Sequence, residues 1–216
     1  MPLFSTDKFQ IEIERNWKNI YNISETVIPP DEREVAAMID QIMEYNKKFV
    51  ENKGYEPYLT SKYPNKKLAV LTCMDTRLTE LLPAALGLKN GDAKIIKNAG
   101  GVITHPYGSV VRSLLVAILE LGVEQVMVIG HTDCGVQGMD GNELLGELVE
   151  RGIDKEHIDI VRHSGIDLEK WLGGFESVEK SVEETVHTLK THPLMPKDIE
   201  IKGFIMDSET GALTEV

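Results

Sequence analysis

The sequence is poor in cysteine and in positive charge. The first shortage argues against structural disulfides, and the second against negatively charged partners. Its 216 residues include only two cysteines, Cys73 and Cys134. A structural disulfide is not expected in a reducing compartment, so metal binding or catalysis is the favoured role of both thiols. Lys and Arg number 23 against 35 Asp and Glu, which leaves a net charge of -12. Such acidity disfavours nucleic acid and anionic membrane surfaces as partners.

Long apolar runs and nucleotide-binding motifs are also missing. No stretch of 18 apolar residues occurs, so we expect no membrane span. The first residues lack a basic start followed by an apolar core, so no secretory signal is expected and a cytoplasmic location is the default. No Gly-x-Gly-x-x-Gly follows a predicted strand, and no Gly-x₄-Gly-Lys-Ser/Thr occurs. These absences argue against a nucleotide-binding protein.

What the chain does contain is an alternation of strand and helix patterns. Short apolar segments between charged or glycine-rich stretches predict strands at 68–73, 94–97, 126–129 and 199–205, with a last short strand at 212–216. Apolar residues at helical spacing predict helices at 31–52, 79–86, 109–121 and 175–189, and several short helices within 142–172. The helix at 109–121 is apolar around much of its circumference, so we expect it to be buried. Pro83 is expected to limit the helix at 79–86.

This order predicts an α/β fold. We expect a central, mostly parallel sheet of about four parallel strands plus an antiparallel edge strand, flanked by helices. The length suits one domain, which we place at 31–216. Residues 1–30 form a predicted N-terminal helical extension, because 7–22 suit one helical face as well as strand alternation and Pro29 ends that unit. A segment this apolar needs a surface to cover, either the domain itself or a partner subunit.

Reactive side chains follow two of the predicted strands. The stretch Leu68–Arg77 reads LAVLTCMDTR, so a buried strand ends in Cys73, with Asp75 and Arg77 at alternate positions after it. The strand at 126–129 is followed by His131 and Cys134. Ligands of open α/β sheets bind at the carboxyl ends of strands, so the two thiols and the imidazole are expected to converge there.

Two thiolates and one imidazole are a donor set that suits Zn²⁺. Three protein ligands leave a fourth position, as in catalytic rather than structural zinc sites. Asp75 could reach that position or a water molecule in it, and Arg77 could hold Asp75 through a bidentate pair. The plainer alternatives are two buried, inert cysteines, a reversible redox pair, and a surface ion pair of Asp75 with Arg77.

The motif Cys73-Met-Asp75-Thr-Arg77 followed by His131-Thr-Asp-Cys134 resembles the signature of the β-class carbonic anhydrases. The segments at 97–101 and 203–211 extend this resemblance to roughly residues 35–216. The resemblance implies that Cys73, His131 and Cys134 bind one zinc ion per chain. It also implies that Asp75 and Arg77 form a catalytic dyad, in which Asp75 can become a fourth zinc ligand in a closed state.

The implied activity is that of a carbonate dehydratase, a zinc lyase. Zinc-bound hydroxide would hydrate CO₂ reversibly to bicarbonate, in a homodimer or higher homo-oligomer with the site at the subunit interface. We expect the substrate pocket near Gly100, Gly101, Val102 and Tyr107, with residues of the other subunit. His105 lies in the loop after the second strand and is a candidate proton shuttle.

Departures from the family pattern keep other functions open. The segment Asn98–Gly101 lacks the further Asn that many members have after the first Gly, and the loop at 105–108 resembles only a subgroup. Related scaffolds hydrolyse carbonyl sulfide or carbon disulfide with the same metal ligands, so a zinc hydrolase is the alternative enzyme. A zinc-binding protein without turnover, its site locked by Asp75, is the non-enzyme alternative.

Overall fold

The structure is a computed structural model that describes residues 32–216, with side chains from residue 38 onward. It divides into two compact units, with the boundary between Leu59 and Thr60. The predicted extension at 1–30, with its helix at 7–22, lies outside the described residues, and the expected domain limit at residue 31 stays a prediction.

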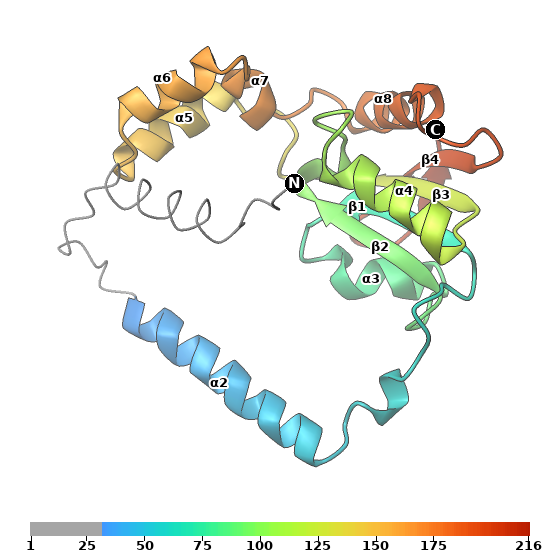
Figure 1. Cartoon of the computed structure of the whole chain (residues 1–216). Coiled ribbons are helices and arrows are strands. Elements are labelled where there is room, and N and C mark those ends of the chain that lie inside the picture. Colours follow the sequence, from blue (N-terminus) through green and yellow to red (C-terminus); the bar gives the residue numbers. More distant parts are fainter. Residues whose placement is uncertain (1–31) are drawn as a thin grey trace, which may run out of the picture. The chain divides into compact units, whose positions relative to one another are not determined.

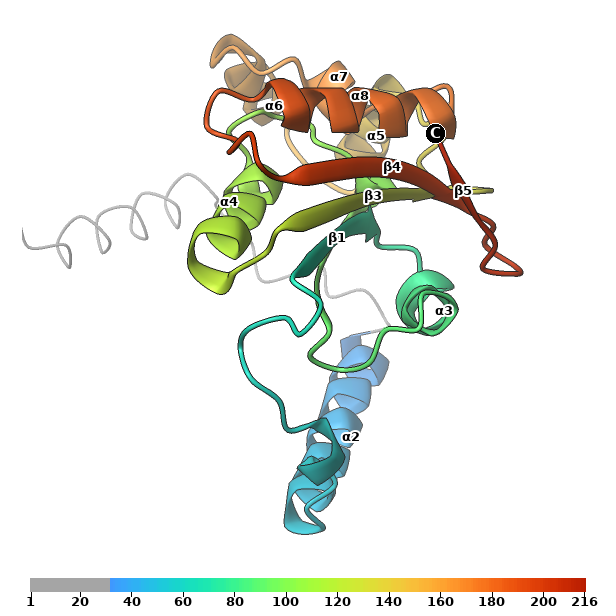
Figure 2. The same cartoon turned by 90° about the vertical axis from the view of Figure 1, so that its right-hand side faces the viewer.

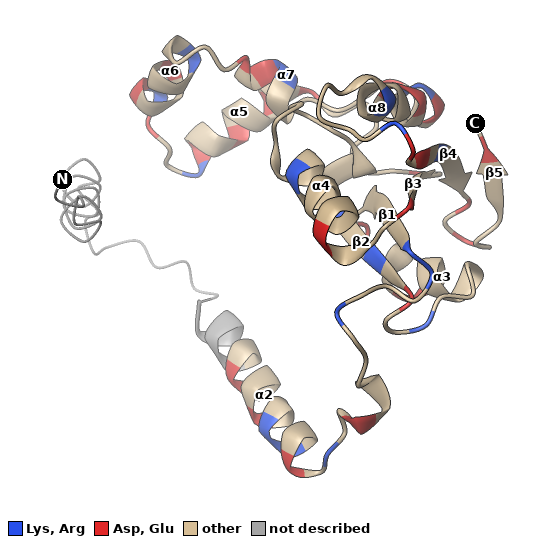
Figure 3. Cartoon of the chain, turned by 45° about the vertical axis from the view of Figure 1, so that its right-hand side comes forward, with Lys and Arg blue, Asp and Glu red and all other residues tan. Residues whose placement is uncertain are grey.

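The described part of the first unit is built on one long helix, α2 (Glu32–Glu51), followed by the short 3-10 turn η1 (Glu56–Tyr58). The predicted helix at 31–52 is thereby confirmed. Acidic and basic side chains both lie along α2 (Figure 3). Large apolar side chains of α2 nevertheless remain more than half exposed, among them Ile39 and Ile42. The helix therefore presents an apolar stripe that the described residues of its own unit do not cover.

The second unit is a five-stranded sheet with helices around it (Figure 1). Its elements in chain order are β1 (Leu68–Cys73), α3 (Leu78–Ala85), β2 (Ala93–Asn98), η2 (Ala99–Gly101), α4 (Ser109–Leu121), β3 (Gln125–His131), α5 (Gly141–Glu150), α6 (Lys155–His163), α7 (Leu168–Leu172), α8 (Val178–Thr191), β4 (Glu200–Met206) and β5 (Leu213–Glu215). The strand order is β2-β1-β3-β4-β5; β1 to β4 are parallel, and β5 is antiparallel to β4. The predicted fold class is confirmed.

Every residue of β1 is buried, because helices cover both faces of the sheet. Helices α4 and α8 pack on one face, where Leu71 of β1 meets Leu114 and Leu189. Helix α3 packs on the other, where Val70 meets Leu78 and Leu82 (Figure 2). The continuous apolar run of the first strand is thus explained by its central place in the sheet.

Two glycines bring α8 close to the sheet. A Cβ atom on Gly130 of β3 would lie 2.7 Å from the side chains of Val178 and Val182. A Cβ atom on Gly203 of β4 would lie 2.7 Å from Val182 as well. Helix α8 can therefore approach β3 and β4 only because these positions lack side chains. This packing supports the strand that ends in His131.

The structure corrects three expectations. Helix α8 begins at Val178, and Phe175 lies before it in an isolated bridge with Gln137. Helix α4 is buried on one side only, since Leu119 is 68% exposed. Pro83 lies inside α3 without ending it, since the helix continues to Ala85. Among residues 32–216, no helix is both long and apolar enough to cross a membrane.

Candidate metal centre

Neighbouring strands bring the predicted ligands together. Cys73 is the last residue of β1 and His131 the last of β3, and the two strands pair in parallel. The turn after β3 carries Cys134 to the same edge. The Sγ atoms of Cys73 and Cys134 are 3.9 Å apart, and these sulfurs and a ring nitrogen of His131 all lie within 4.8 Å of one another. All three residues are buried.

The hydrogen bonds of His131 leave one ring nitrogen free for a metal ion. Its Nδ1 lies 2.8 Å from the carbonyl oxygen of Thr132, which can only accept, so Nδ1 carries the proton. The Nε2 atom is then an acceptor, and it is buried without a hydrogen-bond partner among the described residues. A buried acceptor without a partner calls for an explanation, and a bound cation supplies one. The three residues therefore fit a metal ion.

The environment of the two thiols is also consistent with a bound metal ion. Burial raises the pKa of the Cys134 thiol, and the neighbouring Cys73 raises it further. Without a cation, the Cys134 sulfur is thus not expected to be a thiolate at neutral pH. A coordinated metal ion reverses this, because it deprotonates the thiols that bind it.

Asp75 lies beside this group, held by Arg77. The guanidinium donates from Nε to Oδ1 at 3.0 Å and from Nη2 to Oδ2 at 2.9 Å, and the backbone N–H of Arg77 adds a bond to Oδ1. The side-chain hydrogen bonds with Arg77 outweigh the opposing effect of burial and lower the pKa of Asp75 to about 2. Asp75 is therefore a carboxylate at neutral pH. Its Oδ2 lies 3.8 Å from Nε2 of His131.

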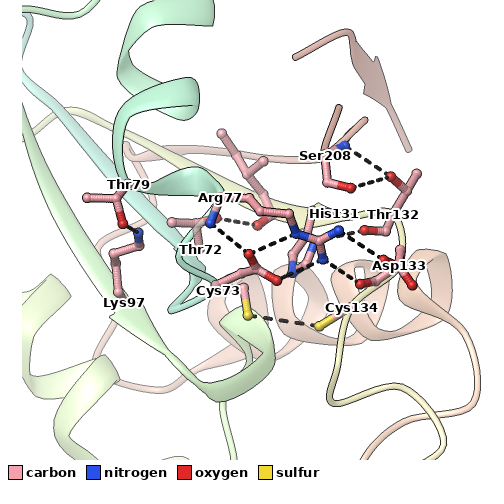
Figure 4. A network of polar contacts seen from close by, with 12 residues as sticks. Thr72, Cys73, Arg77, Thr79, Lys97, His131, Thr132, Asp133, Cys134 and Ser208 are labelled. Atoms are coloured by element: carbon pink, nitrogen blue, oxygen red, sulfur yellow. Dashed lines mark hydrogen bonds and ion pairs between the residues drawn. The ribbon is translucent and has the colours of Figure 1, made fainter. Parts of the chain in front are cut away.

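Asp133 is the site residue that the sequence analysis did not identify. Arg77 donates from Nη1 to Oδ2 of Asp133 at 2.9 Å and from Nη2 to its carbonyl oxygen at 2.7 Å (Figure 4). Asp75 and, after it, Asp133 raise the pKa of Arg77 above its usual value. The sequence signal was the aspartate inside His131-x-x-Cys134, but only the pairing of β1 with β3 shows that it reaches Arg77.

The glycines of η2 make room for β1. A Cβ atom on Gly101 would lie 2.9 Å from the backbone nitrogen of Cys73, and the φ angle of Gly101 is 66°. Only glycine suits such a place. Asn98 closes this turn with two bonds to the backbone of Val102, one from its Nδ2 at 2.7 Å and one to its Oδ1 at 3.1 Å. The turn after β2 is thus packed directly against the strand that carries Cys73.

The other pocket residues predicted from the sequence do not all lie together. Val102 and His105 line one cavity of about 580 Å³, whose wall includes Val136 and Phe175. The last two also pack in the apolar cluster that holds both cysteines. Tyr107 lines a different cavity, of about 410 Å³, with its ring centroid 5.3 Å from that of His192.

Comparison with known proteins shows the family of this chain. A family described as carbonic anhydrase matches residues 68–213. The protein YvdA of Bacillus subtilis strain 168, named as a carbonic anhydrase, is 51% identical over 178 residues, covering 82% of this chain and 90% of the relative. A carbon disulfide hydrolase of Acidithiobacillus thiooxidans is 32% identical over 158 residues, 69% of this chain and 76% of the relative.

Among solved structures, a β-carbonic anhydrase, isoform I of Trichomonas vaginalis, superposes with a TM-score of 0.73 at 34% identity. The match covers 82% of this chain and 96% of that one. The fold and the site thus define a protein of the carbonic anhydrase family. Within that family, the chain belongs to the β class.

Proposed function

We propose that this chain is a carbonate dehydratase, a lyase that hydrates CO₂ reversibly to bicarbonate. The observation that carries the proposal is the buried group of Cys73, His131 and Cys134 beside the Asp75–Arg77 pair. The family supports this activity, and so does the relative YvdA, because its name is that of a carbonic anhydrase and half of its matched residues are identical.

The two cysteines and Nε2 of His131 would hold one zinc ion per chain, through two sulfurs and one nitrogen. Bound there, zinc would lower the pKa of water from 15.7 to about 7 and so make hydroxide available near neutral pH. The bond from Nδ1 of His131 to the Thr132 carbonyl keeps Nε2 deprotonated and directed at the group.

Asp75 would orient the nucleophile. Its carboxylate is ionised at neutral pH and can accept a hydrogen bond, which directs an oxygen lone pair at the carbon of CO₂. The attack would form one carbon–oxygen bond while one C=O electron pair moves to oxygen, which gives bicarbonate. Arg77 holds Asp75 in place with its two side-chain bonds, since a bidentate pair restrains the carboxylate in both position and orientation.

The hydration also releases a proton, and His105 is our proposed shuttle. The Nδ1 atom of His105 accepts from the backbone N–H of Tyr107 at 3.0 Å, so Nε2 carries the proton of the neutral ring. This hydrogen bond has to open before Nδ1 can take up a second proton, which Nε2 can then pass to buffer. Its ring lines the same cavity as Val102, and we propose Gly100, Gly101 and Val102 as part of the substrate pocket. Tyr107 lines a separate cavity and stays a candidate from the sequence alone.

Hydrolysis of carbonyl sulfide or carbon disulfide is the second candidate. It is favoured by the relatives named carbon disulfide hydrolase, at 32% identity for the one described above. The same nucleophile would serve, because these substrates share the linear, electrophilic carbon of CO₂. We rank it second, because the more similar relative is named as a carbonic anhydrase.

A single preparation can test both. We expect metal analysis of the purified protein to give about one zinc per chain, and stopped-flow measurements to detect CO₂ hydration between about pH 6.5 and 9. His131→Gln is expected to lose both metal and turnover, whereas His187→Gln on the exposed side of α8 should lose neither. A protein without zinc would contradict the proposal, and faster turnover of carbonyl sulfide or carbon disulfide would favour the second candidate.

A further inference from the structure

Arg77 is anchored at two places. Two of its four side-chain hydrogen bonds go to the carboxylate of Asp75, and the other two go to the carboxylate and the carbonyl oxygen of Asp133 (Figure 4). Asp133 belongs to the turn after β3, so it ties the guanidinium to the strand that carries His131. The mechanism proposed above uses only the first pair of bonds.

The backbone of Asp133 is also unusual. Its φ angle is 53°, in the left-handed region that residues with a Cβ atom rarely adopt and that Asp and Asn tolerate best. In this conformation both its carbonyl and its carboxylate oxygens reach Arg77. Backbone strain of this kind persists where surrounding contacts stabilise it, and it gathers at functional sites.

We propose that Asp133 is a positioning residue that holds Arg77 in place and thereby keeps the Asp75 carboxylate away from the metal ion. Oδ2 of Asp75 is only 3.8 Å from Nε2 of His131, so a small movement of the side chain would make it a metal ligand. Arg77 opposes this movement only while it is itself held. The role rests on the proposed metal centre.

Without Asp133, the bonds between Arg77 and Asp75 could remain while the pair shifts as a unit. The carboxylate would then compete with water and small anions for the fourth metal position. A purely structural role of Asp133, as part of the turn, predicts no such competition. The difference can be measured without turnover, by the affinity of the loaded site for a small anion.

The test uses the full chain loaded with Co²⁺, whose visible absorption reports its ligands, and titrates it with thiocyanate. We expect Asp133→Asn, which tolerates the same φ angle, to raise the thiocyanate Kd about three- to fivefold, as suits the loss of an exposed charge-assisted bond. Removal of a negative charge alone would lower that Kd, so the expected change has the opposite sign. The exposed Asp198 is the matched control, and Asp198→Asn should leave the Kd unchanged.

A double-mutant cycle assigns the effect to Asp75. In an Asp75→Ala background, Asp133→Asn should leave the thiocyanate Kd within about twofold, because the competing carboxylate is gone. An unchanged or lower Kd in the single variant, or the same rise in both backgrounds, would overturn the role of Asp133 while leaving the metal centre intact. Failure of the wild-type chain to bind Co²⁺ would overturn the metal centre and this role together.

Discussion

At the scale of single residues, the site depends on which atom of each side chain is free. His131 has one nitrogen bonded to the Thr132 carbonyl and one without a partner among the described residues. Asp75 is ionised, because Arg77 lowers its pKa to about 2. A residue that titrates so far below neutrality cannot cause a change of activity between pH 6 and 9, so any such change is expected to come from the metal-bound water or a histidine.

The first prediction concerns Asp75. We expect Asp75→Asn to keep its metal, because none of the three ligands changes, but to lose CO₂ hydration by a factor of about 10² to 10⁴. The carboxylate accepts two hydrogen bonds from the Arg77 side chain and would accept one from the nucleophile, whereas an amide places an NH₂ group against one of these donors. Metal analysis and stopped-flow hydration measure the two effects separately. If the variant turns over at nearly the wild-type rate, Asp75 has no part in the mechanism.

At the scale of elements, the spacing between α8 and the sheet is set by small residues. Gly130 of β3 faces two valines of α8, so β3 and α8 lie closer than side chains would allow. His131 follows Gly130 directly, and its position depends on the same packing.

The second prediction tests that packing. We expect Gly130→Ala to lower the free energy of unfolding by about 1–3 kcal/mol, because the new methyl group would overlap Val178 and Val182. Urea denaturation followed by circular dichroism measures the change. The control is Gly146→Ala in α5, where a Cβ atom meets nothing within 4 Å. That variant should be more stable by roughly 0.5–1 kcal/mol, and equal stability of the two variants would contradict the packing argument.

The turn between β4 and β5 carries the third prediction. Oδ1 of Asp207 accepts from the backbone N–H and the hydroxyl of Thr210, at 2.7 and 2.8 Å, and from the backbone N–H of Glu209 at 3.1 Å. These bonds, with that from the Thr210 backbone the strongest, lower the pKa of Asp207 below its ordinary value of 3.8. The folded chain thus binds the proton of Asp207 less readily than the unfolded chain does.

A lowered pKa stabilises the fold above the unfolded value and loses that effect as the pH falls through the folded value. The urea midpoint of the wild type should therefore exceed that of Asp207→Ala at about pH 6, and the gap should shrink below about pH 4. Asp198→Ala is the control on an exposed aspartate. If the difference between the two urea midpoints stays constant down to about pH 2.5, the charge of Asp207 does not contribute to the stability of the fold.

At the scale of the whole molecule, the exposed apolar stripe of α2 bears on how chains assemble. Helix α2 leaves Met38, Ile39, Ile42 and Met43 more than half exposed, and their spacing puts them on one stripe. Exposed apolar stripes of this kind commonly mark protein–protein contacts. We propose a homodimer or higher homo-oligomer, in which this stripe and the N-terminal extension pack on a partner subunit. The cytoplasmic location expected from the sequence stays a prediction.

The fourth prediction follows from that stripe. Light scattering at micromolar concentration should give at least twice the chain mass of 24.1 kDa. Ile42→Glu is expected to shift the protein toward the monomer, because it buries a charge in the contact. Glu44→Gln, on the opposite side of α2, should leave the mass unchanged. A wild-type monomer would contradict the proposed assembly.

The sequence alone determined the elements and indicated the candidate ligand set. The run 68–73 became β1 with the expected bounds, and Ser109 and Leu121 are the first and last residues of α4. The sequence identified the candidate ligands Cys73, His131 and Cys134 because they lie at or just after the ends of two strands. In a parallel sheet, such strand ends meet at one edge. Periodicity and strand order are local properties, and they can be read from neighbouring residues.

Features that depend on contacts between distant segments were decided only by the tertiary structure. The link from Arg77 to Asp133 spans the pairing of β1 with β3, and the free Nε2 of His131 appears only once its backbone partner is in place. The one-sided burial of α4 and the separation of Tyr107 from Val102 depend in the same way on how the helices pack. Local patterns specify each element, whereas hydrogen-bond partners and cavities arise from segments that meet only when the chain folds.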